Sequence, residues 1–179
     1  MKISVAMAAC NGEKYIMEQL NSILSQLARD DEVCVSVDPS TDDSYRMVVR
    51  VSEQEPRVKV NAGPGAGVLK NVEQALKMCT GDIIFLDVWV EDKVFCVREC
   101  FSDSEVLLVL HDVVVMNENF TEVQCESFFS YKGCKPGILN NIVKNSYMGC
   151  AMAFRKELLQ YVLPFPQKIK KSYFYDTNN

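Results

Sequence analysis

The chain has 179 residues, 48% of them hydrophobic and 24% charged, and its formal net charge is −5. This composition is typical of a single soluble globular domain and excludes a disordered chain. The sequence has no long run of lysine and arginine, which argues against nucleic-acid binding. It also has no stretch of the ~20 apolar residues that a transmembrane segment requires.

The first half of the sequence alternates short apolar runs with amphipathic segments. The apolar runs predict strands at residues 2–8, 32–37, 58–60 and 82–86. Apolar residues at helical spacing predict helices at residues 13–27, 41–54 and 68–78. Strands that alternate with helices at this spacing predict an α/β fold with a mostly parallel central sheet covered on both faces.

The second half of the sequence is less regular. Residues 106–116 predict a further buried strand, residues 146–154 another strand and residues 155–162 a closing helix. Between them, residues 117–144 are polar and predict a long irregular loop. The single histidine, His111, falls within the expected buried strand, and we interpret it as a core residue with satisfied hydrogen bonds.

Ligands of parallel α/β sheets bind beyond the carboxyl ends of the strands. The segments that follow the expected strands are residues 9–12, 38–43, 61–71 and 87–91. Asp38 directly follows the second strand, where a carboxylate can accept hydrogen bonds from a base or a ribose. The structural alternative is that this segment only starts a helix, with Ser40 or Thr41 as its cap.

Two other strand ends carry candidate groups. The glycine-rich residues 63–67 let the backbone approach a ligand, and the helix after them offers amides and Lys70 to a phosphate. They match neither well-known phosphate fingerprint, so a plain connection is an equal alternative. Asp87, beside the single tryptophan Trp89, is placed to meet a metal bound to a diphosphate. Its neighbours Glu91 and Asp92 have an alternative role at a helix start.

Together these motifs resemble the family 2 glycosyltransferases, especially bacterial rhamnosyltransferase-like members that build capsules and other surface polysaccharides. The resemblance covers nearly the whole chain and is carried by residues 5–8, 11–16, 19–26, 38–42, 70–71, 81–86, 135–137, 149–155 and 164–166. It implies a glycosyltransferase A-type, Rossmann-like fold and inverting transfer with a carboxylate base. The implied donor is a nucleoside-diphosphate sugar, the cofactor Mg²⁺ or Mn²⁺, and the acceptor a glycan or a lipid-linked molecule.

The resemblance also implies roles for individual residues. The implied nucleoside site consists of Ala8, Ala9, Asn11 and Asp38. Lys70 and Asn71 are implied to lie near the base or the diphosphate, and Asp87 to face the metal.

The sequence departs from the family pattern in four places, the first being Ala9-Cys10, where the family usually has Thr-Tyr. Val37 stands where the family has the first acid of an Asp-Asp pair, and Asp87 lacks the partner of the usual Asp-x-Asp motif. After Pro166 the family continues to a segment that supplies the base, and here Asp176 is the substitute candidate. Two functions therefore stay open. The first is an active or weakly active sugar transferase, and the second is a degenerate domain that binds a nucleotide or a partner without turnover.

The resemblance divides the chain into two parts. Residues 1–166 are expected to form a nucleotide-sugar-binding glycosyltransferase domain that is shortened at its carboxyl end, and residues 167–179 a divergent basic and aromatic tail.

The eight cysteines include no Cys-x-x-Cys pair, and no secretion signal is recognised, so we expect reduced thiols. The expected location is the cytoplasm, where a peripheral position at the inner face of the membrane is also open.

Overall fold

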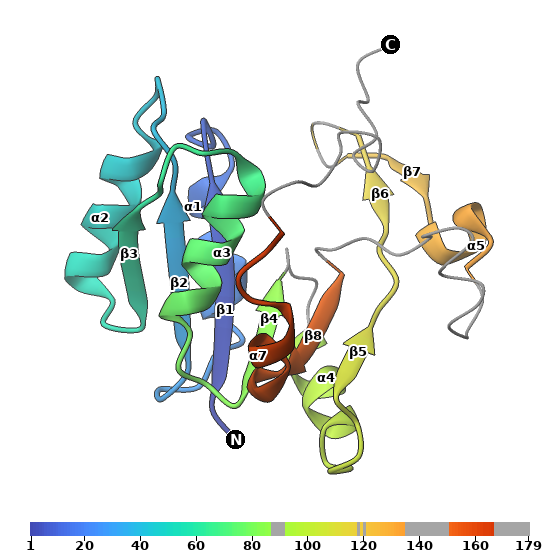
Figure 1. The fold of residues 1–179 in the computed structure, drawn as a ribbon. Helices are drawn as coiled ribbons and strands as arrows, with labels where there is room; N and C mark the ends of the chain where they lie inside the picture. Colours follow the sequence, from blue (N-terminus) through green and yellow to red (C-terminus); the bar gives the residue numbers. More distant parts are fainter. Residues whose placement is uncertain (87–91, 118, 120, 135–150, 167–179) are drawn as a thin grey trace.

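The computed structural model describes residues 1–86, 92–117, 119, 121–134 and 151–166. Their main feature is a six-stranded sheet with the strand order β3-β2-β1-β4-β8-β5 (Figure 1). Four of its strands are parallel: β1 (Ile3–Ala9), β2 (Glu32–Val37), β3 (Val58–Ala62) and β4 (Ile83–Leu86). At the far end, β8 (Met152–Arg155) runs antiparallel to both β4 and β5 (Leu108–Leu110). The expected mostly parallel sheet is confirmed.

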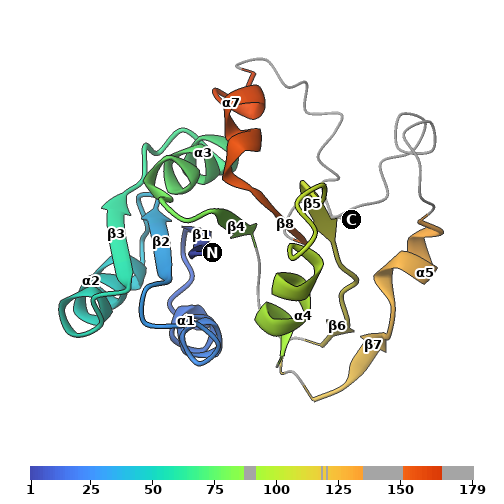
Figure 2. The ribbon, with the colours of Figure 1, turned by 90° about the horizontal axis from the view of Figure 1, so that it is seen from below.

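Helices cover both faces of this sheet (Figure 2). One face carries α1 (Ile16–Leu24), α2 (Ser44–Gln54) and α4 (Lys93–Cys100), and the other carries α3 (Val68–Met78), η1 (Lys156–Leu158) and α7 (Leu159–Val162). The side chains of β1 alternate accordingly, because Ile3 and Val5 pack in the first core and Ala6 in the second. None of the described helices has the length and apolar character needed to cross a membrane.

The second half of the chain differs from the prediction. The expected buried strand at residues 106–116 is wrong, because the chain forms β5, leaves the strand conformation and then forms the short β6 (Val115–Met116). The interruption follows from Asp112, whose carboxylate accepts hydrogen bonds from the amides of Val113 (2.9 Å) and Phe129 (2.8 Å). His111 lies in this interruption and is only partly buried, so its placement in a buried strand was also wrong.

The expected loop at residues 117–144 contains two regular elements among its described residues. These are β7 (Val123–Cys125), which pairs with β6, and α5 (Phe128–Lys132). The Ser127 hydroxyl accepts a hydrogen bond from the Ser130 amide at the start of α5, and Gly133 ends the helix with a φ of 63°. Some of the residues that predicted a loop, such as Ser127 and Gly133, therefore cap a short helix.

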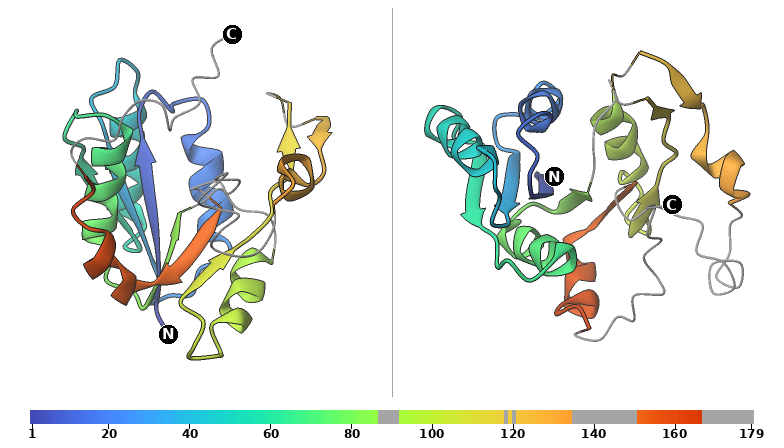
Figure 3. Two further views of the ribbon diagram at one scale, coloured as in Figure 1. Left: turned by 45° about the vertical axis from the view of Figure 1, so that its right-hand side comes forward. Right: turned by 90° about the horizontal axis from the view of Figure 1, so that it is seen from above.

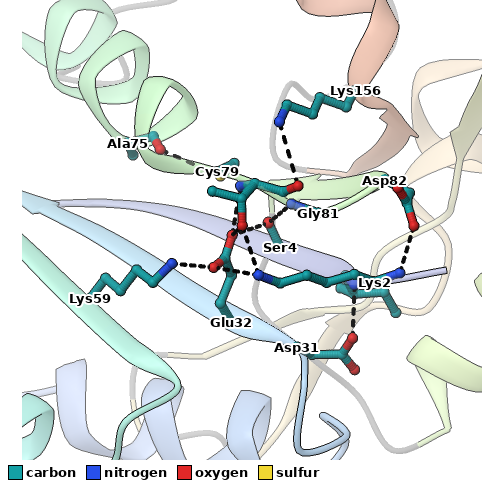
Figure 4. Close-up of polar contacts among 12 residues, drawn as sticks. Lys2, Ser4, Asp31, Glu32, Lys59, Ala75, Cys79, Gly81, Asp82 and Lys156 are labelled. Carbon is teal, nitrogen blue, oxygen red and sulfur yellow. Dashed lines mark hydrogen bonds and ion pairs between the residues drawn. The ribbon is translucent and has the colours of Figure 1, made fainter.

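A buried carboxylate holds the amino edge of the sheet together (Figure 4). The side chain of Glu32 accepts hydrogen bonds from Lys2 Nζ (2.9 Å), Ser4 Oγ (2.6 Å) and both the amide and the hydroxyl of Thr80 (2.6 and 2.8 Å). Lys59 Nζ supplies a further ion pair at 2.5 Å. This cluster lies at the end of the sheet opposite to the carboxyl ends of the strands, and its partners already satisfy the carboxylate.

Candidate functional site

The candidate site begins at the carboxyl end of β1. The carbonyl oxygen of Ala9 accepts hydrogen bonds from the amide of Asp38 (2.9 Å) and from Nδ2 of Asn71 (3.0 Å). Asp38 follows β2, and Asn71 lies in the first turn of α3. One carbonyl group therefore joins three positions that are far apart in the sequence, and all three were expected at this edge of the sheet.

The Asp38 carboxylate determines the path of the glycine-rich residues 63–67. Its Oδ1 accepts a hydrogen bond from the Gly65 amide (2.9 Å), and the Gly63 amide donates to the Val37 carbonyl (2.7 Å). Gly65 has a φ of 64°, and a Cβ added to it would lie 3.2 Å from the ring of Pro39. Asp38 is 8% exposed, so its carboxylate is partly desolvated. A carboxylate held in this way is fixed in orientation before any ligand arrives.

Gly63 lies between Asp38 and Asn71. A Cβ at this position would be 2.4 Å from Asp38 Oδ1 and 2.5 Å from Asn71 Oδ1, so no side chain fits there. Asn71 is 2% exposed, and its Oδ1 has no hydrogen-bond partner among the described residues. The buried Asn71 amide therefore holds the end of β1 through the Ala9 carbonyl, and Asp38 is slightly more exposed than Asn71. Buried side-chain acceptors without a hydrogen-bond partner are uncommon in native proteins.

The loops after β1 and β2 are bound to each other. Asn11 has a φ of 50°, its amide donates to Ser40 Oγ (3.0 Å), and its Oδ1 accepts from the Thr41 amide (2.8 Å). The Glu13 amide donates to Asp42 Oδ2 (3.0 Å), and hydrogen bonds from Ser44 and Glu13 lower the pKa of Asp42. These contacts form a rigid rim on one side of the site, to which Asn11 contributes.

The capping alternative for this segment is wrong. The residue before the first turn of α2 is Asp43, and its side chain makes no capping hydrogen bond. Ser40 and Thr41 lie further upstream and bind Asn11 instead. Their hydroxyl groups therefore connect the loop after β2 to the loop after β1.

Lys70 and Asn71 point in different directions from α3. Asn71 faces the sheet, whereas the Lys70 ammonium forms an ion pair with Glu73 Oε2 (2.8 Å). Glu73 also binds Lys77 Nζ through Oε1 (2.6 Å). The sequence prediction missed Glu73, although its spacing of three and four residues from the two lysines is the usual signal for such pairs on a helix.

Three further residues were expected in the site, namely Ala8, Asp87 and Asp176. Ala8 pairs with Ser36 in the sheet, next to Ala9. Asp87 and Asp176 lie outside the described residues, so their roles stay predictions. Within the described ranges, no three side chains of His, Cys, Asp or Glu come together to hold a metal ion. The Mg²⁺ or Mn²⁺ site that the resemblance implies therefore stays a prediction.

Comparison with known proteins connects this geometry to a family. Residues 4–88 match the family model "Glycosyl transferase family 2". An uncharacterized glycosyltransferase of Nostoc sp. is 30% identical over 176 residues, which cover 92% of this chain and 54% of that protein. The chondroitin synthase of Escherichia coli is 33% identical over 79 residues, 44% of this chain and 12% of that protein. The chain thus spans about half the length of its Nostoc relative.

Solved structures share the fold. Staphylococcus aureus TarS in complex with UDP-GlcNAc superimposes with a TM-score of 0.67 at 24% identity, covering 90% of this chain and 47% of that one. The mannosyltransferase PcManGT of Pyrobaculum calidifontis, in complex with GDP-Man and Mn²⁺, also gives 0.67 at 22% identity, covering 93% and 48%. Residues 4–88, which run from the second residue of β1 past the end of β4 and include the described part of the site, therefore match the family 2 glycosyltransferases, and the described residues share the glycosyltransferase A-type fold.

Proposed function

We propose that the chain binds a nucleoside-diphosphate sugar at the carboxyl edge of β1 to β3. The observation that carries this proposal is the Asp38 carboxylate, fixed by the Gly65 amide at 2.9 Å beside the carboxyl end of β1. A carboxylate in this position accepts hydrogen bonds from the base or the ribose, while Ala8, Ala9 and Asn11 form the adjoining wall. Ligands of open α/β sheets bind at this edge.

The diphosphate is assigned to the start of α3. The helix begins at Val68, directly after Gly67, so the amides of its first turn favour an anion. Lys70 lies in the same turn and supplies a cation, and Asn71 fixes the turn against β1. When Mg²⁺ or Mn²⁺ is bound, it would neutralise charge on the diphosphate, with Asp87 as the expected protein ligand. The P. calidifontis mannosyltransferase supports this assignment, because it was solved with GDP-Man and Mn²⁺.

The proposed reaction is inverting transfer of a hexosyl or rhamnosyl group to a glycan or lipid-linked acceptor. Relatives named chondroitin synthase and hyaluronan synthase support a polysaccharide product. We place this reaction in the cytoplasm, at or near the inner face of the membrane, where Asp176 is the candidate base.

A second candidate function is nucleotide binding without turnover. It is supported by the sequence from Leu86 to Trp89, which provides one acid, Asp87, where the resembled family has an Asp-x-Asp pair. A turnover assay with Mn²⁺ and a panel of acceptors separates the two functions. Acceptor-dependent transfer establishes the transferase, and nucleotide binding without transfer establishes the second function.

Replacing Asp38 with asparagine tests the proposed site. The variant keeps an oxygen that can accept the Gly65 amide but loses the charge, so nucleoside-diphosphate affinity should fall about tenfold or more. The measurement is titration calorimetry with several nucleoside diphosphates. Asp43→Asn is the matched control, because Asp43 lies on the same edge in an exposed ion pair with Arg46 and should change affinity less than about twofold. Equal affinities of the two variants would remove Asp38 from the site.

A further inference from the structure

Glu73 receives more polar contacts than a helix ion pair needs. Its Oε2 accepts from Lys70 Nζ (2.8 Å) and from the Phe165 amide (3.3 Å), and its Oε1 accepts from Lys77 Nζ (2.6 Å). The residue is 4% exposed, although both lysines reach solvent. A nearly buried carboxylate thus joins the first turn of α3 to a residue 92 positions away in the sequence.

The segment that contains Phe165, residues 163–165, lies along α3 (Figure 3). Leu163 and Phe165 pack against the second core, which contains Ala75 and Leu76 of α3. The Phe165 amide reaches the same carboxylate oxygen as the Lys70 ammonium. This oxygen therefore keeps a backbone partner when Lys70 leaves it.

The carboxylate of Glu73 is ionised at neutral pH. Hydrogen bonds from Lys70 and Lys77 lower the pKa of Glu73 to about 2 from its ordinary value of 4.5. In this arrangement the Lys70 ammonium contacts the Glu73 carboxylate on the same helix, which neutralises its charge. A diphosphate at the start of α3 must therefore compete with Glu73 for the Lys70 ammonium, and the free energy of the existing ion pair opposes binding.

We propose that Glu73 is a positioning residue that sets the nucleotide affinity of the site by holding Lys70 away from the diphosphate. Diphosphate binding transfers the Lys70 ammonium from Glu73 to the ligand, and Lys77 and the Phe165 amide then continue to compensate the carboxylate. This inference rests on the proposed nucleotide site. It also links residues 163–165 to that site, because the Phe165 amide donates a hydrogen bond to Glu73.

The test is a double-mutant cycle on nucleotide affinity. Glu73→Gln keeps an oxygen for the Phe165 amide and removes the anion, so nucleoside-diphosphate affinity should rise about threefold to tenfold. In a Lys70→Met background the same substitution should bring no gain. A merely structural role for Glu73 would lower affinity or leave it unchanged, and would not depend on Lys70. Glu53→Gln, an exposed change on α2, controls for the loss of one negative charge.

The outcomes separate this inference from the function on which it rests. If the wild-type chain binds none of the nucleotides, the proposed function fails and the inference fails with it. If the wild type binds and Glu73→Gln brings no gain, or a gain that persists without Lys70, only the inference is overturned. Should Glu73→Gln not fold, Glu73→Asp keeps the charge on a shorter side chain, and a Lys70-dependent gain is expected there too. Unchanged or lower affinity in that variant overturns the inference in the same way.

Discussion

Replacing Gly63 with alanine is expected to lower the free energy of unfolding by about 3 kcal/mol and to abolish nucleotide binding. The added Cβ would lie 2.4 Å from Asp38 Oδ1, 2.5 Å from Asn71 Oδ1 and 2.8 Å from the Asp38 amide nitrogen. The last of these contacts is with backbone, so the ends of β2 and β3 must separate. The carboxylate then loses its fixed position beside Ala9. Urea unfolding measures the stability, and titration calorimetry on the folded variant measures the binding.

Two other glycines provide matched controls. A Cβ on Gly81 would lie 2.8 Å from backbone atoms of Lys2, Ile3 and Ser4, at the opposite edge of the sheet. Gly81→Ala should therefore cost about as much stability as Gly63→Ala and leave the affinity of the folded protein unchanged. For Gly12 the nearest atom to an added Cβ is Ser44 Oγ at 4.0 Å, so Gly12→Ala should retain stability. A Gly63→Ala variant as stable as Gly12→Ala would show that the three strand ends are not packed as described.

Replacing Glu32 with glutamine is expected to cost about 3 kcal/mol of stability. The carboxylate is 2% exposed and accepts from Ser4, Thr80 and two lysines. The amide of glutamine cannot accept all of these donors, and its NH₂ group faces ammonium groups. The lysines are partly exposed and regain water, so the cost arises mainly from the buried Ser4 hydroxyl and from the part-buried hydrogen bonds of Thr80. Urea unfolding near neutral pH measures the difference from wild type.

The pH dependence of the stability difference between wild type and Glu32→Gln tests whether the charge of Glu32 causes that difference. Burial raises the pKa of Glu32, but the hydrogen bonds from Lys59, Ser4 and Thr80 outweigh it and hold the pKa well below the ordinary value of 4.5. A carboxylate with a depressed folded-state pKa stabilises the protein fully above its unfolded-state pKa and loses this contribution as the pH falls. The gap between wild type and Glu32→Gln should therefore narrow below about pH 4.5. The exposed control Glu53→Gln should stay within about 0.5 kcal/mol of wild type throughout, and a constant Glu32→Gln gap would contradict the charge-based explanation.

The sequence predicted the first half of the fold because local patterns and tertiary packing agree there. The bounds of β2 and α3 coincide with those read from periodicity. The predicted helix at residues 13–27 is shorter in the structure, where α1 spans Ile16–Leu24. The turn before it is held by the Tyr15 amide on the Gly12 carbonyl and by contacts with the loop after β2. Periodicity along one helix cannot report a contact between two loops.

The candidate site was predicted in part. The convergence of Ala9, Asp38 and residues 63–67 followed from a parallel sheet, in which all strand ends meet at one edge. The contact of Glu73 with Phe165 could not be predicted, because it joins residues 92 positions apart without a motif. The division of residues 106–116 into β5 and β6 depends on Asp112 contacting Phe129, which is likewise a tertiary contact.

Amide hydrogen exchange with and without nucleotide tests the central claim most directly. We expect UDP or GDP, added in excess with Mn²⁺, to slow exchange in three segments, residues 9–12, 38–43 and 63–71. Residues near Glu32 and Gly81, at the opposite edge of the sheet, should exchange at unchanged rates. Protection confined to that opposite edge, or no protection at nucleotide concentrations that saturate binding in calorimetry, would contradict the assignment of the nucleotide site to the carboxyl ends of β1 to β3.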